Sequence, residues 1–252
     1  MVQTLLLSFA HPDDETFLTG GLAARCAGAG IKVVLATATL GESGKPGDPP
    51  ICRPDELPAV RERELRDAVR LLGISELHLL GHRDRELAAA PPERIREQLV
   101  GLLRRARPTV VVTFDPNGAN LHPDHIAISR FTSDAIAAAA DARWFPGLGA
   151  AHLVRRLLWI PGRRPWELVR REDLSEQPGV DFVVDVGEWR DQKAAALRAH
   201  ATQHRSAERN FFSQPDADRL LSTELFRQAW GPPLPHRPLT DIFAGIAGVI
   251  DR

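Results

Sequence analysis

The chain has 252 residues, of which 43% are hydrophobic and 26% charged, and its formal net charge is -1. This length is enough for one sizeable hydrophobic core, and we expect a single domain over residues 1–252. The nearly neutral balance offers no basic surface for nucleic acid or an anionic membrane, and no apolar run approaches the ~20 residues of a membrane span. We therefore expect neither a nucleic-acid partner nor a membrane span.

The two cysteines, Cys26 and Cys52, provide no disulfide framework, which favours a reducing compartment. No partner pattern surrounds Cys52, which argues against a catalytic thiol. The N-terminus shows neither a basic region nor the cleavage signature of a secretory signal. We expect a cytoplasmic protein. A homo-oligomer remains open, because nothing in the sequence fixes the oligomeric state.

Strands and helices alternate along the chain. A continuous apolar strand over residues 4–10 precedes a helix from about Thr16 to Ala27, which Gly28 ends. The later predicted strands are 31–37, 76–80, 109–114, 153–159 and 182–186, and the later helices are 58–72, 92–105, 126–140, 189–202 and 220–230. This alternation predicts a Rossmann-like, doubly wound α/β fold with a mainly parallel sheet flanked by helices.

Three other segments read as irregular. Residues 38–54 contain four Gly or Pro clusters and form a long loop, of the kind that lines binding sites. Residues 205–218 are polar and loop-like, and the chain after Gly231 is rich in proline. Residues 141–180 are the best candidate for a domain boundary and could form a capping segment that covers the site.

Two polar clusters follow predicted strands. His11, Asp13, Asp14 and Glu15 come directly after the first strand, and Asp115–His125 follows the fourth. In a doubly wound sheet, ligands bind beyond the carboxyl ends of the strands, so both clusters should meet at that rim. The acidic residues could instead cap a helix, but a cap explains neither His11 nor the two histidines of the second cluster, His122 and His125. Histidines and a carboxylate with one open position are typical of catalytic zinc.

The motifs Ala10-His11-Pro12-Asp13-Asp14-Glu15 and His122-Pro123-Asp124-His125 resemble those of the LmbE-like, or PIG-L, family of zinc-dependent de-N-acetylases. That family includes deacetylases of N-acetylglucosaminyl conjugates in mycothiol, bacillithiol and glycosylphosphatidylinositol biosynthesis, and deacetylases of chito-oligosaccharides. Weaker similarities cover most of the chain and thin out between about 141 and 180.

The resemblance implies that His11, Asp14 and His125 hold the metal, which we expect to be Zn²⁺ or another divalent ion such as Fe²⁺. It implies that Asp13 is the general base for metal-activated water, and this agrees with the chemistry of zinc, which lowers the pKa of bound water to about 7. His122 is then free to stay protonated, to stabilise the oxyanion or to protonate the leaving amine. Asp124 can orient one of the histidines.

The same resemblance implies that Arg61 and Asp84 bind hydroxyl groups of the substrate. Arg61 could equally form an ion pair with Glu64 on the surface of a helix. Asn120 could donate to the sugar or to a reaction oxygen, or could satisfy loop backbone. Mycothiol-type deacetylases often have a tyrosine at the position of Asn120, and this chain contains no tyrosine, which counts mildly against a mycothiol-type substrate. His200 lies at a predicted helix end, where an interaction with the helix dipole is the simpler explanation. The resemblance makes His200 only a weak candidate for supporting the metal site without binding the metal.

The leading functional hypothesis is a zinc-dependent hydrolase that removes acetyl from an N-acetylglucosaminyl conjugate. One alternative is an amidase that cleaves the larger amide of a thiol-sugar conjugate. Another is a metal-dependent carbohydrate-binding protein without catalysis.

Overall fold

A computed structural model describes residues 3–161, 174 and 177–246 of the chain. Its strands are β1 (Thr4–Phe9), β2 (Lys32–Thr37), β3 (Glu76–Leu79), β4 (Val110–Phe114), β5 (Arg156–Ile160), β6 (Phe182–Asp185) and β7 (Thr223–Trp230). They form one seven-stranded sheet in the order β3-β2-β1-β4-β5-β7-β6. β1 to β5 are parallel, and β7 runs antiparallel to both β5 and β6. The predicted α/β fold with a mainly parallel sheet is confirmed.

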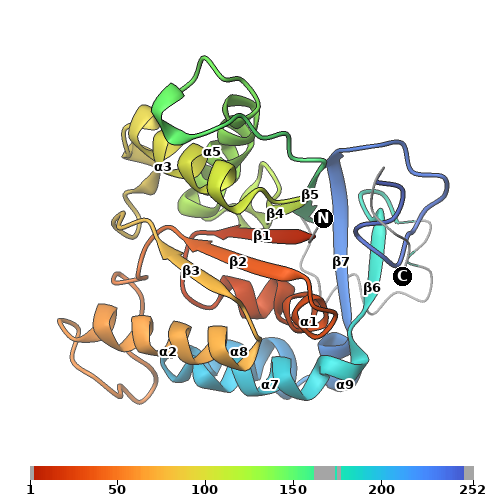
Figure 1. Ribbon diagram of the computed structural model, residues 1–252. Coiled ribbons are helices and arrows are strands. Elements are labelled where there is room, and N and C mark those ends of the chain that lie inside the picture. The colour runs from red at the N-terminus through yellow and green to blue at the C-terminus, as the bar shows by residue number, and fades with distance from the viewer. Residues whose placement is uncertain (1–2, 162–173, 175–176, 247–252) are drawn as a thin grey trace.

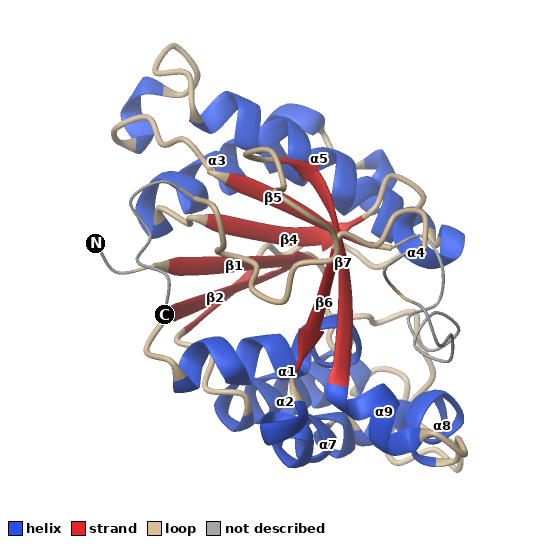
Figure 2. Cartoon of the chain, turned by 90° about the vertical axis from the view of Figure 1, so that its right-hand side faces the viewer, coloured by secondary structure: helices blue, strands red, loops and turns tan. Residues whose placement is uncertain are grey.

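Helices cover both faces of this sheet (Figures 1 and 2). The helices are α1 (Asp14–Gly28), α2 (Leu57–Leu71), α3 (Pro92–Ala106), α4 (Gly118–Leu121), α5 (Pro123–Ala139), α7 (Arg190–Ala199), α8 (His204–Ala207) and α9 (Ala217–Ser222). Figure 2 shows α3 and α5 on one face and α1, α2, α7 and α9 on the other. The sheet is therefore buried between two helical layers, as its apolar strands require.

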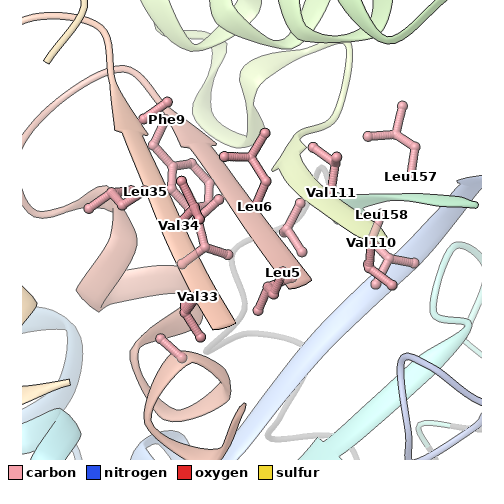
Figure 3. Close-up of a cluster of buried hydrophobic side chains, with 14 of the residues drawn as sticks. Leu5, Leu6, Phe9, Val33, Val34, Leu35, Val110, Val111, Leu157 and Leu158 are labelled. Atoms are coloured by element: carbon pink, nitrogen blue, oxygen red, sulfur yellow. The ribbon is translucent and has the colours of Figure 1, made fainter. Parts of the chain in front are cut away.

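The central strands carry the core. All six residues of β1 are buried, and side chains from β1, β2, β4 and β5 pack together in the cluster drawn in Figure 3. Full burial of a leucine such as Leu5 or Leu7 stabilises the fold by about 1.5–3 kcal/mol relative to an exposed side chain. This rigid core holds the loops that leave the carboxyl ends of the strands, where the polar clusters lie.

The C-terminal third departs from the sequence prediction. The predicted helix 220–230 is wrong, because α9 ends at Ser222 and the rest is β7. Leu220, Leu221, Leu225 and Phe226 have a helix-like spacing, but pairing of β7 with two neighbouring strands decides the conformation. The loop predicted over 205–218 is wrong in part, since α8 and a π-helical segment, Glu208–Phe212, occupy its first half.

Other boundaries moved by smaller amounts. The predicted helix 189–202 ends at Ala199, and a separate 3₁₀ turn follows at Ala201–Gln203. Residues 162–173 and 175–176 of the predicted capping segment lie outside the described residues. Within the described residues, no helix is both long and apolar enough to cross a membrane.

Candidate metal centre and active site

The polar clusters meet where the strand order reverses. β1 lies between β2 and β4, so the loops after β1 and β4 leave the sheet side by side. His11 follows β1, and His125 lies in the first turn of α5, which follows β4. The loops after β2 and β3 bring Gly41 and Asp84 to the same rim.

His11, Asp14 and His125 form a small triangle of ligand atoms. His11 Nδ1 lies 3.1 Å from His125 Nε2, and Asp14 lies 3.4 Å from His125 Nε2 and 3.7 Å from His11 Nδ1 through its two carboxylate oxygens. A tetrahedral zinc ion with bonds of about 2.0–2.1 Å separates its ligands by about 3.3 Å. The donor types therefore suit zinc and the distance between the two nitrogens matches its spacing, while Asp14 meets the two nitrogens through different oxygens.

In each histidine of the triangle, the ring nitrogen that points away from the triangle has a hydrogen-bond partner. This leaves the lone pair of the other ring nitrogen directed toward the centre of the triangle. His125 Nδ1 lies 3.1 Å from the carbonyl oxygen of Gly118, to which it donates as Nδ1–H. His11 Nε2 lies 3.1 Å from Asp84 Oδ1 and 3.3 Å from Asp124 Oδ2. We infer from these partners that His11 Nδ1 and His125 Nε2 are the atoms free to bind a metal.

The same neighbours separate the pKa values of the two histidines. Burial lowers the pKa of His125 to about 4, with repulsion from His11 acting in the same direction. Burial also opposes the charge on His11, but its hydrogen bonds to Asp124 and Asp84 prevail and raise its pKa to about 10. Without a metal, His11 is thus the member of the pair that the surrounding carboxylates favour as a cation, and a metal bound at Nδ1 would have to replace the proton on that atom.

Asp13 lies beside the triangle in an unusual backbone conformation. Its φ of 113° is in a region that residues with a side chain rarely adopt, which costs about 1–3 kcal/mol. Burial raises the pKa of Asp13 to about 6, although the guanidinium of Arg61 opposes this shift. A carboxylate with a pKa near 6 is well matched to a general base at neutral pH.

Arg61 forms an ion pair with the carboxylate of Asp13. Its Nη2 atom lies 3.2 Å from Asp13 Oδ2 and also donates to the carbonyl of Pro12, while Nη1 donates to Gly41 O at 3.0 Å. The alternative of a surface ion pair with Glu64 is wrong, because both residues are buried and Glu64 accepts hydrogen bonds from Thr202. Binding of a substrate hydroxyl by Arg61 stays a prediction.

Asp84 and Asn120 contact the protein itself. Asp84 joins His11 through Oδ1 and accepts the backbone N–H of Ser43 through Oδ2 at 3.0 Å. Although burial acts against it, the hydrogen bond to His11 holds the pKa of Asp84 well below its usual range. Asn120 is exposed, and its Oδ1 accepts the backbone N–H of His122 at 3.0 Å. Asn120 thus satisfies loop backbone, and substrate contacts by either residue stay predictions.

His122 lies at the edge of the triangle. Its Nδ1 accepts the N–H of Asp124 at 3.2 Å, which leaves its proton on Nε2. Burial and the nearby charge of His11 lower the pKa of His122, which favours a neutral hydrogen-bond donor over a protonated imidazolium. Its ring centre lies 4.8 Å from that of His11 and 4.9 Å from that of His125.

Asp124 is fully buried and contacts His11. Its Oδ2 accepts the backbone N–H of Arg85 at 2.6 Å in addition to its contact with His11, and an orienting role for it stays a prediction. Its other oxygen, Oδ1, is buried without a hydrogen-bond partner among the described residues.

His200 is a residue whose setting the sequence did not reveal. Its assignment to a helix dipole is wrong, because the side chain is fully buried and its Nε2 lies 2.8 Å from Glu15 Oε1. Glu15 and His200 are far apart in the sequence, and no motif links them, so only the tertiary structure could pair them.

Fold and site together define an α/β enzyme with a candidate metal centre at the switch point of its sheet. A family model described as GlcNAc-PI de-N-acetylase, PIG-L, matches residues 6–136. The chain is 37% identical to the 1D-myo-inositol 2-acetamido-2-deoxy-alpha-D-glucopyranoside deacetylase of Nocardia farcinica, over 97% of each chain. It is 33% identical to the protein of that name from Streptomyces scabiei, over 97% of this chain and 90% of the relative.

Solved structures agree with this relationship. The conserved protein TT1542 from Thermus thermophilus has a TM-score of 0.70 at 28% identity, covering 93% of this chain and 97% of its own. The N,N'-diacetylchitobiose deacetylase of Pyrococcus horikoshii has a TM-score of 0.69 at 20% identity, covering 90% and 83%, and at that identity shows the fold alone. The chain belongs to the PIG-L family. It is a hydrolytic enzyme of the deacetylase class, which sets aside the alternative of a non-catalytic binding protein.

Proposed function

We propose that this enzyme is a zinc-dependent N-deacetylase that hydrolyses the acetamido group of an N-acetylglucosaminyl conjugate to acetate and a free amine. The observation that carries the proposal is the triangle of His11, Asp14 and His125 with the carboxylate of Asp13 beside it. The named activity of the full-length relatives supports the choice of reaction.

The residues present fit a metal. Two imidazole nitrogens and one carboxylate without cysteine suit catalytic zinc, and the same donors also suit Fe²⁺. Asp124 Oδ1, a buried oxygen without a described partner, places further negative charge behind His11. A zinc ion held there would act as a Lewis acid on the acetyl carbonyl and lower the pKa of water to about 7.

The remaining steps belong to the chain's own residues. Asp13, with its raised pKa, accepts the proton of the water that attacks the amide carbon. His122 presents Nε2–H to the oxygen that becomes negative in the tetrahedral intermediate, which a neutral imidazole can do. The C–N bond then breaks, and the proton held by Asp13 passes to the leaving amine.

The relatives favour inositol as the aglycone of the sugar, since their names specify an inositol glucosaminide. The absence of tyrosine counts mildly against this choice and leaves His122 as the candidate donor in this loop. Cleavage of a larger amide in a thiol-sugar conjugate remains the second candidate, because the same triangle and base would serve either amide.

The test is a measurement of metal content coupled to detection of released amine and acetate. N-acetylglucosaminyl inositol, N-acetylglucosaminyl malate and diacetylchitobiose form the panel, with a thiol-sugar conjugate as the larger amide. We expect about one zinc per chain and the fastest acetate release from the inositol conjugate. Asp13→Asn should keep the zinc and lose turnover by at least about 100-fold. Full activity of Asp13→Asn, or release of only the larger acyl group, would contradict the proposal.

A further inference from the structure

Glu15 and His200 form a buried acid–histidine pair outside the metal triangle. Both side chains are fully buried, and Glu15 Oε1 lies 2.8 Å from His200 Nε2. Glu15 belongs to the first turn of α1, and His200 is the C-cap residue that follows α7. The hydroxyl of Thr16 also donates to Glu15 Oε1, at 2.6 Å. Burial of a charged pair is costly unless its partners are well placed, so this pair needs a reason.

The pair reaches Asp13 through the second oxygen of Glu15. Glu15 Oε2 accepts the backbone N–H of Asp13 at 3.0 Å. That peptide belongs to the residue with φ of 113°, a conformation that persists only where the surroundings hold it. Arg61 holds the other end of the same residue at its carboxylate. Asp13 is therefore fixed at its backbone by Glu15 and at its side chain by Arg61.

The carboxylates of the adjacent residues Asp13 and Asp14 point in different directions where the backbone takes this conformation. Asp14 Oδ2 accepts the backbone N–H groups of Ala10 and His11, at 3.2 and 2.8 Å, and the same carboxylate forms one corner of the metal triangle. Asp13 turns toward Arg61 instead. Relaxation of the Asp13 peptide to an ordinary helical conformation would change the direction of its carboxylate relative to the triangle.

A purely structural tether exists nearby for comparison. Lys193 Nζ lies 2.8 Å from Glu224 Oε1, both side chains are 2% exposed, and Glu224 accepts the N–H groups of Gly21 and Leu22 in α1. This second pair also joins α1 to α7, but among the described residues none of its hydrogen bonds involves Asp13. Tethering of the two helices therefore does not by itself require the Glu15–His200 pair.

We propose that Glu15 and His200 are positioning residues for the reaction: His200 fixes the Glu15 carboxylate, which holds the Asp13 peptide in the conformation that directs the general base. This inference rests on the proposed function, because Asp13 acts as a base only in that mechanism. Among the described residues, the hydrogen bonds of this pair reach Asp13 and Thr16 and no ligand atom of the triangle, so we expect its effect in turnover rather than in metal binding.

The experiment compares His200→Ala, the conservative His200→Gln and the control Glu224→Gln in the zinc-loaded enzyme. His200→Ala should lower kcat by about 10- to 100-fold, as expected for a displaced catalytic group, with KM within about twofold and zinc content unchanged. His200→Gln should recover most of the turnover, because its amide N–H can still donate to Glu15. Glu224→Gln should lower the unfolding temperature while kcat stays near that of the wild type.

A second variant avoids the large cavity that His200→Ala creates. Thr16→Val keeps the side-chain volume but removes one hydrogen bond to Glu15, and it should lower kcat by about three- to tenfold at constant KM. Wild-type turnover in His200→Ala or in Thr16→Val would overturn the positioning role. So would equal losses of turnover and stability in His200→Gln and Glu224→Gln. Failure of the proposed function would look different, as an inactive wild type or an active Asp13→Asn.

Discussion

The Nε2 atom of His11 lies 3.1 Å from Oδ1 of Asp84, so a residue after β3 orients a metal-binding candidate after β1. A carboxylate behind a ligating histidine fixes its tautomer and increases its basicity. Resemblance to the family implied a substrate contact for Asp84. The structure adds a second candidate role, the orientation of His11, which can be measured as zinc affinity.

Replacement of Asp84 by alanine should weaken zinc affinity by about 10- to 100-fold, because His11 loses its closest carboxylate. Competition with a chromophoric chelator measures this constant directly. Asp181→Ala is a suitable control, as Asp181 is a similarly buried carboxylate bonded to Arg237 and to the backbone of Gln228. Unchanged zinc affinity in Asp84→Ala would leave substrate binding as the role of this residue.

Replacement of His122 by alanine should reduce kcat by about 10²- to 10³-fold, the usual effect of removing one oxyanion donor. Zinc content should stay at the wild-type value, because Asp14 completes the triangle. The ring nitrogens of His11, His122 and His125 also approach one another within 4.8 Å, so a three-histidine centre is the competing arrangement. Loss of zinc from His122→Ala would favour that centre.

Replacement of Arg61 by methionine should move the acidic limb of the kcat/KM profile to higher pH. Burial already raises the pKa of Asp13 to about 6, and Arg61 is the charge that opposes the rise, so its removal raises the pKa further. Because the base must be deprotonated, the variant should lose more activity at about pH 6 than at about pH 8. Arg104→Met serves as the control, since Arg104 is buried and donates to the carbonyls of Ala139, at the end of α5, and of Phe145. A profile that coincides with wild type would contradict the clamp on Asp13.

Removal of metal by a chelator should abolish turnover and lower the unfolding temperature, and added zinc should restore both. A ligand present at about 100 times its dissociation constant stabilises the fold by about 2.7 kcal/mol, which corresponds to about 5–10 °C for a chain of this size. Asp14→Ala should remove this difference, because it deletes one corner of the triangle. An equal zinc-dependent shift in Asp14→Ala would place the ion elsewhere.

The sequence by itself determined the framework of the protein and the identity of its main polar residues. Local patterns suffice there: the apolar run of β1 must be buried on both faces, and alternation with helices requires a parallel sheet. Position at strand ends then brought His11 and His125 to one rim. Resemblance to a family, rather than periodicity, supplied their division into ligands, with Asp13 as the base.

Only the tertiary structure decided how these residues are held. The pairings of His11 with Asp84 and of His200 with Glu15 join distant segments, and no local pattern encodes such contacts. The same limit explains the error at β7, whose conformation depends on hydrogen bonds to two other strands. Side-chain chemistry is local and can be read from one residue, whereas orientation, tautomer and pKa depend on neighbours that folding alone brings together.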